Sequence, residues 1–304
     1  MSEDLEERDD RGRTPLMRAC EDGDLEQVQR LIDKGANIEA KDHEDWTPMI
    51  LACQNGHESI VRFLIDKGAN IETGSIIQAA ENGNAAIVEL LVRAGGDIND
   101  NQEGGTTPLI LASQQGHVDV VDCLLSLGAD TEVKDWLGKT ALMMASENGM
   151  VDVVDRLLAA GCNVNARGNG GSTALMFAAH GGHVPIIDRL VVHGADFNHQ
   201  SEKGQNALML ASKSGHIEAV DRLLSLGCDV NDQNEDGWTA LMFSSSQENI
   251  DLVRFLLDHG ADPLLQDKNG KRTIDLVWSK EIKTLLNGLI LLSFHHHHHH
   301  DHVP

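Results

Sequence analysis

The chain has 304 residues, and its 48 Asp and Glu outnumber its 24 Lys and Arg, giving a formal net charge of −24. An acidic field repels nucleic acid and anionic lipid, so neither nucleic acid nor a membrane is an expected partner. The charge is uneven, since residues 1–152 hold 30 acidic and 12 basic side chains (−18) and residues 153–304 hold 18 and 12 (−6). This negative charge has two alternative explanations: it keeps a large exposed surface soluble, or it attracts a basic protein partner.

Residues 1–12, MSEDLEERDDRG, are mostly charged and predict a disordered acidic lead-in. A repeating pattern begins at Arg13. Thr14-Pro15 opens one amphipathic helix, because proline is well tolerated in the first helical turn. The apolar spacing that starts at Leu25 predicts a second helix, which Gly35 terminates.

Downstream, the same pattern recurs with a period of 33 residues, as at Thr107, Thr140, Thr173, Asn206 and Thr239. A fixed period of this size is typical of a solenoid, in which each unit buries its apolar face against its neighbours. One unit is six residues short, and the missing residues fall between Glu72 and Gly74. Both helices of that unit are retained, so we expect only its connecting hairpin to be truncated.

These residues also carry a family resemblance: TPLILASQQGHVDVVDCLLSLGADTEVKDWLG (107–138) resembles an ankyrin repeat. The resemblance implies an all-α ankyrin-repeat α-solenoid of helix-turn-helix units with short β-hairpin fingers, about eight repeats plus a C-terminal cap. It predicts a single domain over residues 13–294. The expected repeats lie near 13–45, 46–73, 74–105, 106–138, 139–171, 172–204, 205–237 and 238–270, followed by a cap at 271–294.

The expected cap is a shortened unit that contains Trp278, Ile282, Leu285 and Leu286. An apolar tail, Leu289 to Leu292, follows it and either packs on the cap or marks where a longer protein was cut. Residues 295–300 are six histidines, so we interpret residues 295–304 as a purification tag and cloning residues.

One position departs from the family pattern. The histidine of the T-P-L-H motif is replaced throughout by an apolar residue, so apolar packing must take over its role between units. The replacements are Met17, Ile50, Ile77, Ile110, Met143, Met176, Met209 and Met242.

The five cysteines follow the repeat phase rather than a disulfide pattern, and no signal peptide or long apolar run is found. We therefore expect a cytoplasmic protein, with the nucleus as the alternative, that exists as a monomer.

Fragments that imitate catalytic or metal motifs have simpler interpretations. Gly138-Lys139-Thr140 lacks the first glycine of a phosphate loop, and Phe243 stands where a calcium loop needs its last glutamate. His180 and His183 are spaced like a metal pair, but His183 occupies the recurrent Gly-His position that begins each second helix. We predict no enzymatic activity, no cofactor and no metal site.

The resemblance implies that a ligand contacts the hairpin fingers and the residue pair after each first helix. The candidate binding residues of the pairs are Glu21, Asp22, Gln54, Asn55, Glu81, Asn82, Gln114, Gln115, Glu147, Asn148 and Lys213. Trp46, Trp136 and Trp238 are candidate anchors in the fingers, since tryptophan is enriched at binding hot spots. The alternative is that each tryptophan packs on a neighbouring finger, an interpretation that we prefer for Trp46 and Trp238.

The predicted function is a non-catalytic protein-interaction module or scaffold that binds a protein partner on its concave face, with a basic segment of the partner over the first repeats. Three alternatives stay open. The chain could be a recruitment domain cut from a larger enzyme, channel or effector, or an engineered scaffold. It could also be a substrate, because Asp229-Val230-Asn231 resembles the context that asparaginyl hydroxylases modify, with Asn231 as the hydroxylation site.

Overall fold

A computed structural model describes residues 3–300, apart from the side chains of Thr73, Leu289 and 292–300. It divides into two compact units. Unit 1 holds the described residues up to 145 together with 155–162, and unit 2 holds 146–154 together with those from 163 onwards.

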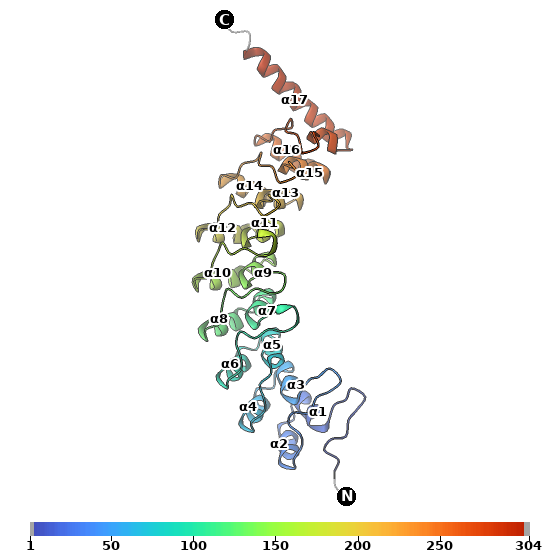
Figure 1. Ribbon diagram of the computed structural model, residues 1–304, viewed down its shortest axis with the longest axis vertical. Coiled ribbons are helices and arrows are strands. Elements are labelled where there is room, and N and C mark those ends of the chain that lie inside the picture. The colour runs from blue at the N-terminus through green and yellow to red at the C-terminus, as the bar shows by residue number, and fades with distance from the viewer. Residues whose placement is uncertain (1–2, 301–304) are drawn as a thin grey trace. The chain divides into compact units, whose positions relative to one another are not determined.

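Both units are built from pairs of short antiparallel helices (Figure 1). The pairs of unit 1 are α1 (Pro15–Asp22) with α2 (Leu25–Asp33), α3 (Pro48–Gln54) with α4 (Glu58–Asp66), α5 (Thr73–Glu81) with α6 (Ala85–Arg93), and α7 (Pro108–Gln115) with α8 (Val118–Ser126). The pair α9 (Ala141–Glu147) and α10 (Val151–Ala159) spans the division. The pairs of unit 2 are α11 (Ala174–Gly181) with α12 (Val184–Val192), α13 (Ala207–Lys213) with α14 (Ile217–Ser225), and α15 (Ala240–Ser246) with α16 (Ile250–Asp258).

The first helices of successive pairs pack against one another, α3 on α5 and α5 on α7, while α4, α6 and α8 form a second row (Figure 1). Each first helix begins where the sequence predicts. The Thr14 hydroxyl accepts from the Met17 N–H at 3.3 Å, and Asn206 does the same for Met209 at 2.9 Å. These caps satisfy amides that a helix N-terminus otherwise leaves unpaired.

The helix core confirms the expected apolar packing at the replaced histidine position. All eight side chains there are at most 5% exposed, from Met17 and Met242 at 0% to Ile50 at 5%. Burial of side chains of this size stabilises the fold by roughly 1.5–3 kcal/mol each.

A second position of each first helix, three residues after the replaced histidine, is occupied by a small residue where neighbouring helices meet. Its members are Cys20, Cys53, Ala80, Ser113, Ser146, Ala179, Ser212 and Ser245, all with 0% exposure. Burial raises the pKa of the Cys20 thiol to about 12, so this cysteine stays protonated at neutral pH. Both Cys20 and Cys53 are free thiols, as expected for cysteines that follow the repeat phase rather than a disulfide pattern.

Ser212 offers a direct test of this packing. Its hydroxyl is buried without a hydrogen-bond partner, whereas Ala179 occupies the same phase one pair earlier. We expect Ser212→Ala to raise the free energy of unfolding by about 1 kcal/mol, because an unsatisfied buried hydroxyl is removed. Urea denaturation measures the change, and Ser214→Ala, at a half-buried hydroxyl that contacts His180, is the control. A destabilised Ser212→Ala would show that the hydroxyl has a partner in solution.

Turns before every first helix except α5, and one before residues 273–276, replace the expected β-hairpin fingers. Residues 3–300 contain no β-strand beyond an isolated antiparallel bridge between Gln266 and Arg272. We call these segments fingertip turns and number their four residues one to four. They are 9–12, 42–45, 102–105, 135–138, 168–171, 201–204, 234–237 and 267–270. In each, the N–H of the first turn residue donates to the carbonyl four residues later, over 2.7–3.2 Å.

The lead-in differs from the disorder that its charge predicts. Residues 9–12 form a fingertip turn, and Arg8 donates to the Lys41 carbonyl at 2.5 Å. Glu3 pairs with Arg30 at 2.9 Å. Residues 9–12 therefore form the same turn as later units, because Asp9 and Gly12 repeat the D-x-x-G pattern of Asp135 and Gly138.

The truncated pair lacks a fingertip turn, as its missing residues predict. Helix α5 begins at Thr73, three residues after Asn70, whose N–H bonds to Glu39. Ile71 of the shortened connection lies close to Gly96: a Cβ on Gly96 would be 3.0 Å from its methyl group and 2.8 Å from Cδ1 of Ile76 in α5. Every other pair carries alanine or cysteine at the Gly96 position, so glycine is the accommodation to the deletion.

At the C-terminal end, η3 (Thr273–Leu276) leads into α17 (Lys280–His300). Ile282 and Leu286 are buried, as expected for a cap. Trp278 of the same segment is 91% exposed. Residues 301–304 of the predicted tag region lie outside the described residues.

Candidate functional site

The predicted residue pairs lie at the C-terminal ends of the first helices. Their side chains are half-buried or exposed, and backbone contacts fix their positions. The exposed members are Asp22, Asn55, Glu81, Asn82, Gln115, Asn148 and Lys213, and the half-buried members are Glu21, Gln54, Gln114 and Glu147.

Histidines of the next helix pair hold these helix ends. The Nε2 of His57 lies 2.9 Å from the Glu21 carbonyl, His117 lies 2.7 Å from that of Glu81, and His183 lies 2.9 Å from that of Glu147. A carbonyl only accepts, so each Nε2 carries the proton and donates. These bonds connect successive pairs, a role that the sequence does not reveal, and the His183 ring is used structurally.

A second set of connections uses the loops after the second helices. The Asn231 side chain donates to the Gly260 carbonyl at 3.2 Å and accepts from the Asp262 N–H at 2.8 Å. Asn165 makes the equivalent bonds to Gly194 and Asp196. In the folded chain, both the NH2 group and the oxygen of the Asn231 side chain, the predicted hydroxylation site, are therefore hydrogen-bonded.

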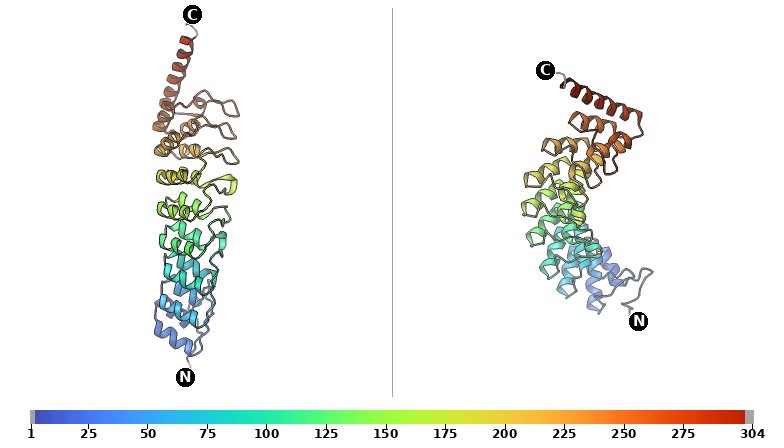
Figure 2. Two further views of the ribbon diagram at one scale, coloured as in Figure 1. Left: turned by 90° about the vertical axis from the view of Figure 1, so that its left-hand side faces the viewer. Right: turned by 45° about the horizontal axis from the view of Figure 1, so that its top comes forward.

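The fingertip turns are connected by backbone bonds that we call rungs. The N–H of a second turn residue donates to the carbonyl of the third turn residue in the preceding turn. The rungs are His43 to Arg11 (3.1 Å), Trp136 to Gly104 (2.8 Å), Glu202 to Gly170, Glu235 to Lys203 and Lys268 to Asp236 (each 2.9 Å). In unit 2 the turns project side by side from the first helices (Figure 2).

The three predicted tryptophans have different environments. Trp46 is half-buried against Met17, Ala40 and Leu51. Trp238 packs on Phe243, with ring centroids 5.0 Å apart. These two positions directly precede the first helix, and their side chains pack on residues of the helix core rather than on a neighbouring finger.

Trp136 is the second residue of its turn and is 70% exposed, next to Leu137 at 67%. Its backbone is fixed by the rung to Gly104, and Asp135 accepts from the Leu137 and Lys139 amides at 2.9 Å. A rigid turn therefore presents two large apolar side chains to solvent. Of the three, Trp136 has the geometry expected of a binding anchor.

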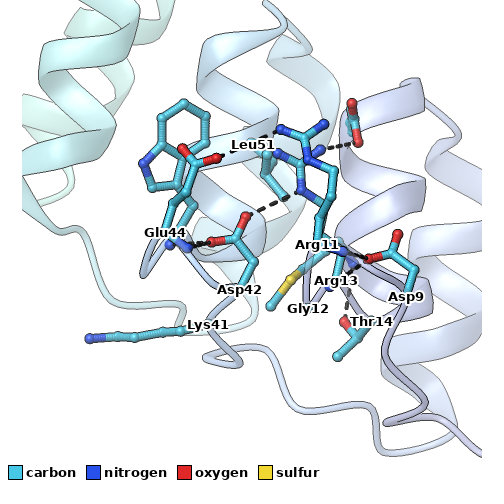
Figure 3. A network of polar contacts seen from close by, with 12 residues as sticks. Asp9, Arg11, Gly12, Arg13, Thr14, Lys41, Asp42, Glu44 and Leu51 are labelled. Carbon is cyan, nitrogen blue, oxygen red and sulfur yellow. Dashed lines mark hydrogen bonds and ion pairs between the residues drawn. The ribbon is translucent and has the colours of Figure 1, made fainter.

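A buried ion network lies beneath the first turns of unit 1 (Figure 3). Arg13 is 3% exposed, and its Nη1 lies 2.6 Å from Glu21 and its Nε 3.2 Å from Asp42. Burial lowers the pKa of Arg13, but the two carboxylates raise that pKa by more than burial lowers it, so the net shift is upward. Asp42 also accepts the Glu44 and Trp46 amides at 2.8 and 2.9 Å. Glu21, predicted as a binding residue, is thus committed to a structural ion pair.

None of the helices described over residues 3–300 has the length and apolarity needed to cross a membrane.

Known proteins with similar sequences or structures share this architecture of repeated helix pairs. A family model described as ankyrin repeats, in three copies, matches residues 2–74, 76–168 and 175–267. Comparison with the sequences of curated proteins finds no match. Among solved structures, the crystal structure of the human ASB11 ankyrin repeat domain is similar, with a TM-score of 0.64 and 24% identity. That match covers 69% of this chain and 95% of the other, and at this identity it shows the fold alone. Most of the chain is covered by the family model, and the chain belongs to the ankyrin-repeat family.

Proposed function

We propose that this chain is a non-catalytic protein-interaction module whose binding surface lies in unit 1 and whose partner is a basic protein segment. Ankyrin repeats are generally protein-protein interaction modules, and their fold is typically non-catalytic. The partner class and the surface are our inference from the residues.

The observation that carries the proposal is the exposed pair Trp136 and Leu137 on a turn fixed by backbone bonds. A rigid, exposed tryptophan gains a large contact area on binding and loses little conformational entropy. The other tryptophans at the turns, Trp46 and Trp238, are used for packing. The Trp136 ring lies over Gly105 of the preceding turn, where an added Cβ would be 2.7 Å from its Cδ1, and 70% of the side chain still remains exposed to a partner.

Charge supports a basic partner. Exposed acidic side chains lie on the fingertip turns of unit 1, at Glu44, Asp45 and Glu103, and at helix ends, at Asp22 and Glu81. Acidic groups on the unit that also carries the apolar anchor favour a complementary basic segment and speed its association.

The test is capture of a partner from cell lysate by the purified full chain, at low salt and at roughly 0.5 M salt, where exposed charge pairs are screened. We expect Trp136→Ala to reduce retention about 10-fold or more, because truncation of a hot-spot residue costs about 2 kcal/mol or more. Trp278→Ala is the matched control, since Trp278 is also exposed but lies near the C-terminal cap. Asp22→Asn with Glu81→Gln should weaken retention only at low salt.

Equal retention by the wild-type chain and Trp136→Ala would refute this surface. So would equal loss in the Trp278→Ala control, because any exposed tryptophan would then account for capture.

A further inference from the structure

The row of rungs is interrupted once within unit 1. Turn 42–45 precedes α3 and turn 102–105 precedes α7, while α5 between them has no turn because of the six missing residues. In the regular register, the Glu44 carbonyl would accept from the missing turn and the Glu103 N–H would donate to it. Neither group has a hydrogen-bond partner within residues 3–300.

The helices do not close this interruption. Helix α5 packs between α3 and α7, as α3 packs between α1 and α5. The turns before α3 and α7 are therefore separated by one complete helix pair, and the described chain forms no fingertip turn between them. The interruption thus offers a donor and an acceptor in the register of a reverse turn.

Another rung shows which side chain suits the Glu44 side of the interruption. Lys268 donates its backbone N–H to the Asp236 carbonyl at 2.9 Å, and its Nζ reaches the Asp236 carboxylate at 2.6 Å. Asp236 is a third turn residue, and Glu44 holds the same position in its turn. The Glu44 carboxylate is exposed and lies 3.9 Å from the exposed Arg11 (Figure 3). A loose surface pair of this kind contributes little, so it leaves Glu44 available to a second cation.

The opposite side of the interruption is also acidic. Glu103 is an exposed second turn residue, the position of Lys268 in its own rung. In the Lys268–Asp236 pair the second turn residue is basic and the third turn residue is acidic. Glu103 is an acidic second turn residue, so it would pair with a basic third residue of an incoming turn. Both sides therefore select positive charge at adjacent positions of one turn.

We infer that the interruption receives a reverse turn of a partner protein that carries two consecutive basic residues. The first basic residue donates its N–H to the Glu44 carbonyl and pairs with the Glu44 carboxylate. The second accepts the Glu103 N–H on its carbonyl and pairs with the Glu103 carboxylate. This inference rests on the proposed function and names the chemistry of its partner.

The probe is a fluorescent cyclic peptide that presents the turn Asp-Lys-Arg-Gly, titrated with the full chain by fluorescence anisotropy. We expect the double variant E44Q/E103Q to bind it about 10-fold more weakly or worse, since two charge-assisted contacts are lost. The matched control is E202Q/E235Q, which alters two second turn residues whose rungs are occupied and should not change the affinity. N-methylation of the peptide's lysine amide removes one rung donor and should weaken binding similarly.

Amide exchange followed by NMR gives an independent readout. In the free chain the Glu103 amide should exchange fast, while the rung amides of Glu202 and Glu235 are protected, and the peptide should slow exchange at Glu103. Equal binding by E44Q/E103Q and wild type, no effect of N-methylation, or a protected Glu103 amide in the free chain would overturn the inference. Protection that rises with protein concentration alone would assign the site to a second copy instead. A partner captured through Trp136 without any peptide binding would overturn the inference and leave the proposed function standing.

Discussion

Arg13→Met is expected to lower the free energy of unfolding of unit 1 by about 3–5 kcal/mol, because it leaves buried carboxylate charge without its cation. Arg13 is 3% exposed, and the Asp42 side chain beside it is only 2% exposed. The methionine keeps much of the apolar volume of arginine, so the loss reports the charge rather than a cavity.

Urea denaturation monitored by helical circular dichroism and by tryptophan fluorescence measures the effect, since Trp46 packs beside the network. Arg11→Met is the control, because Arg11 is exposed and its 3.9 Å pair with Glu44 should contribute less than about 1 kcal/mol.

Asp42→Asn separates the charge from the turn. An asparagine at this position can still accept the two turn amides, as Asn234 does for Asp236 and Trp238. In the Arg13→Met background we expect Asp42→Asn to recover part of the lost stability, because it removes the orphaned charge. An Arg13→Met variant no less stable than Arg11→Met would show that water already solvates the network.

The helix pairs, their boundaries and the truncated unit could be predicted from sequence, because helix caps and apolar spacing are local signals. The turn at 9–12 could have been found as well, since Asp9 and Gly12 stand 33 residues before Asp42 and Asp45. High charge favoured disorder there, but the repeat phase was the stronger signal.

The ion network and the rungs could not be predicted in the same way. Arg13 meets Glu21 and Asp42 across 8 and 29 residues, and charges at the edge of a repeat are usually solvated. The rungs use only backbone atoms, so their donors share no side-chain type. The difference between Trp136 and the other tryptophans was readable, because Trp136 alone holds the second position of a turn.

Gly182→Ala is expected to lower the free energy of unfolding of unit 2 by about 2–4 kcal/mol, through two separate effects. Gly182 ends α11 with φ +72°, and a Cβ there would lie 2.6 Å from Cγ of the His216 ring. The left-handed backbone alone costs alanine about 1–2 kcal/mol, and overpacking against a ring adds the rest.

Gly194→Ala isolates the backbone effect, because Gly194 has φ +93° and no atom lies within 4 Å of the position that an alanine methyl group would take there. A double-mutant cycle isolates the steric effect. In a His216→Ala background, Gly182→Ala should cost no more than Gly194→Ala, since the ring that blocks the methyl group is gone. If the cost of Gly182→Ala is the same with and without His216, the ring moves aside freely and does not fix the contact between α11 and α14. A cost that falls in the His216→Ala background instead establishes the glycine-histidine contact as one of the interactions that hold successive helix pairs together.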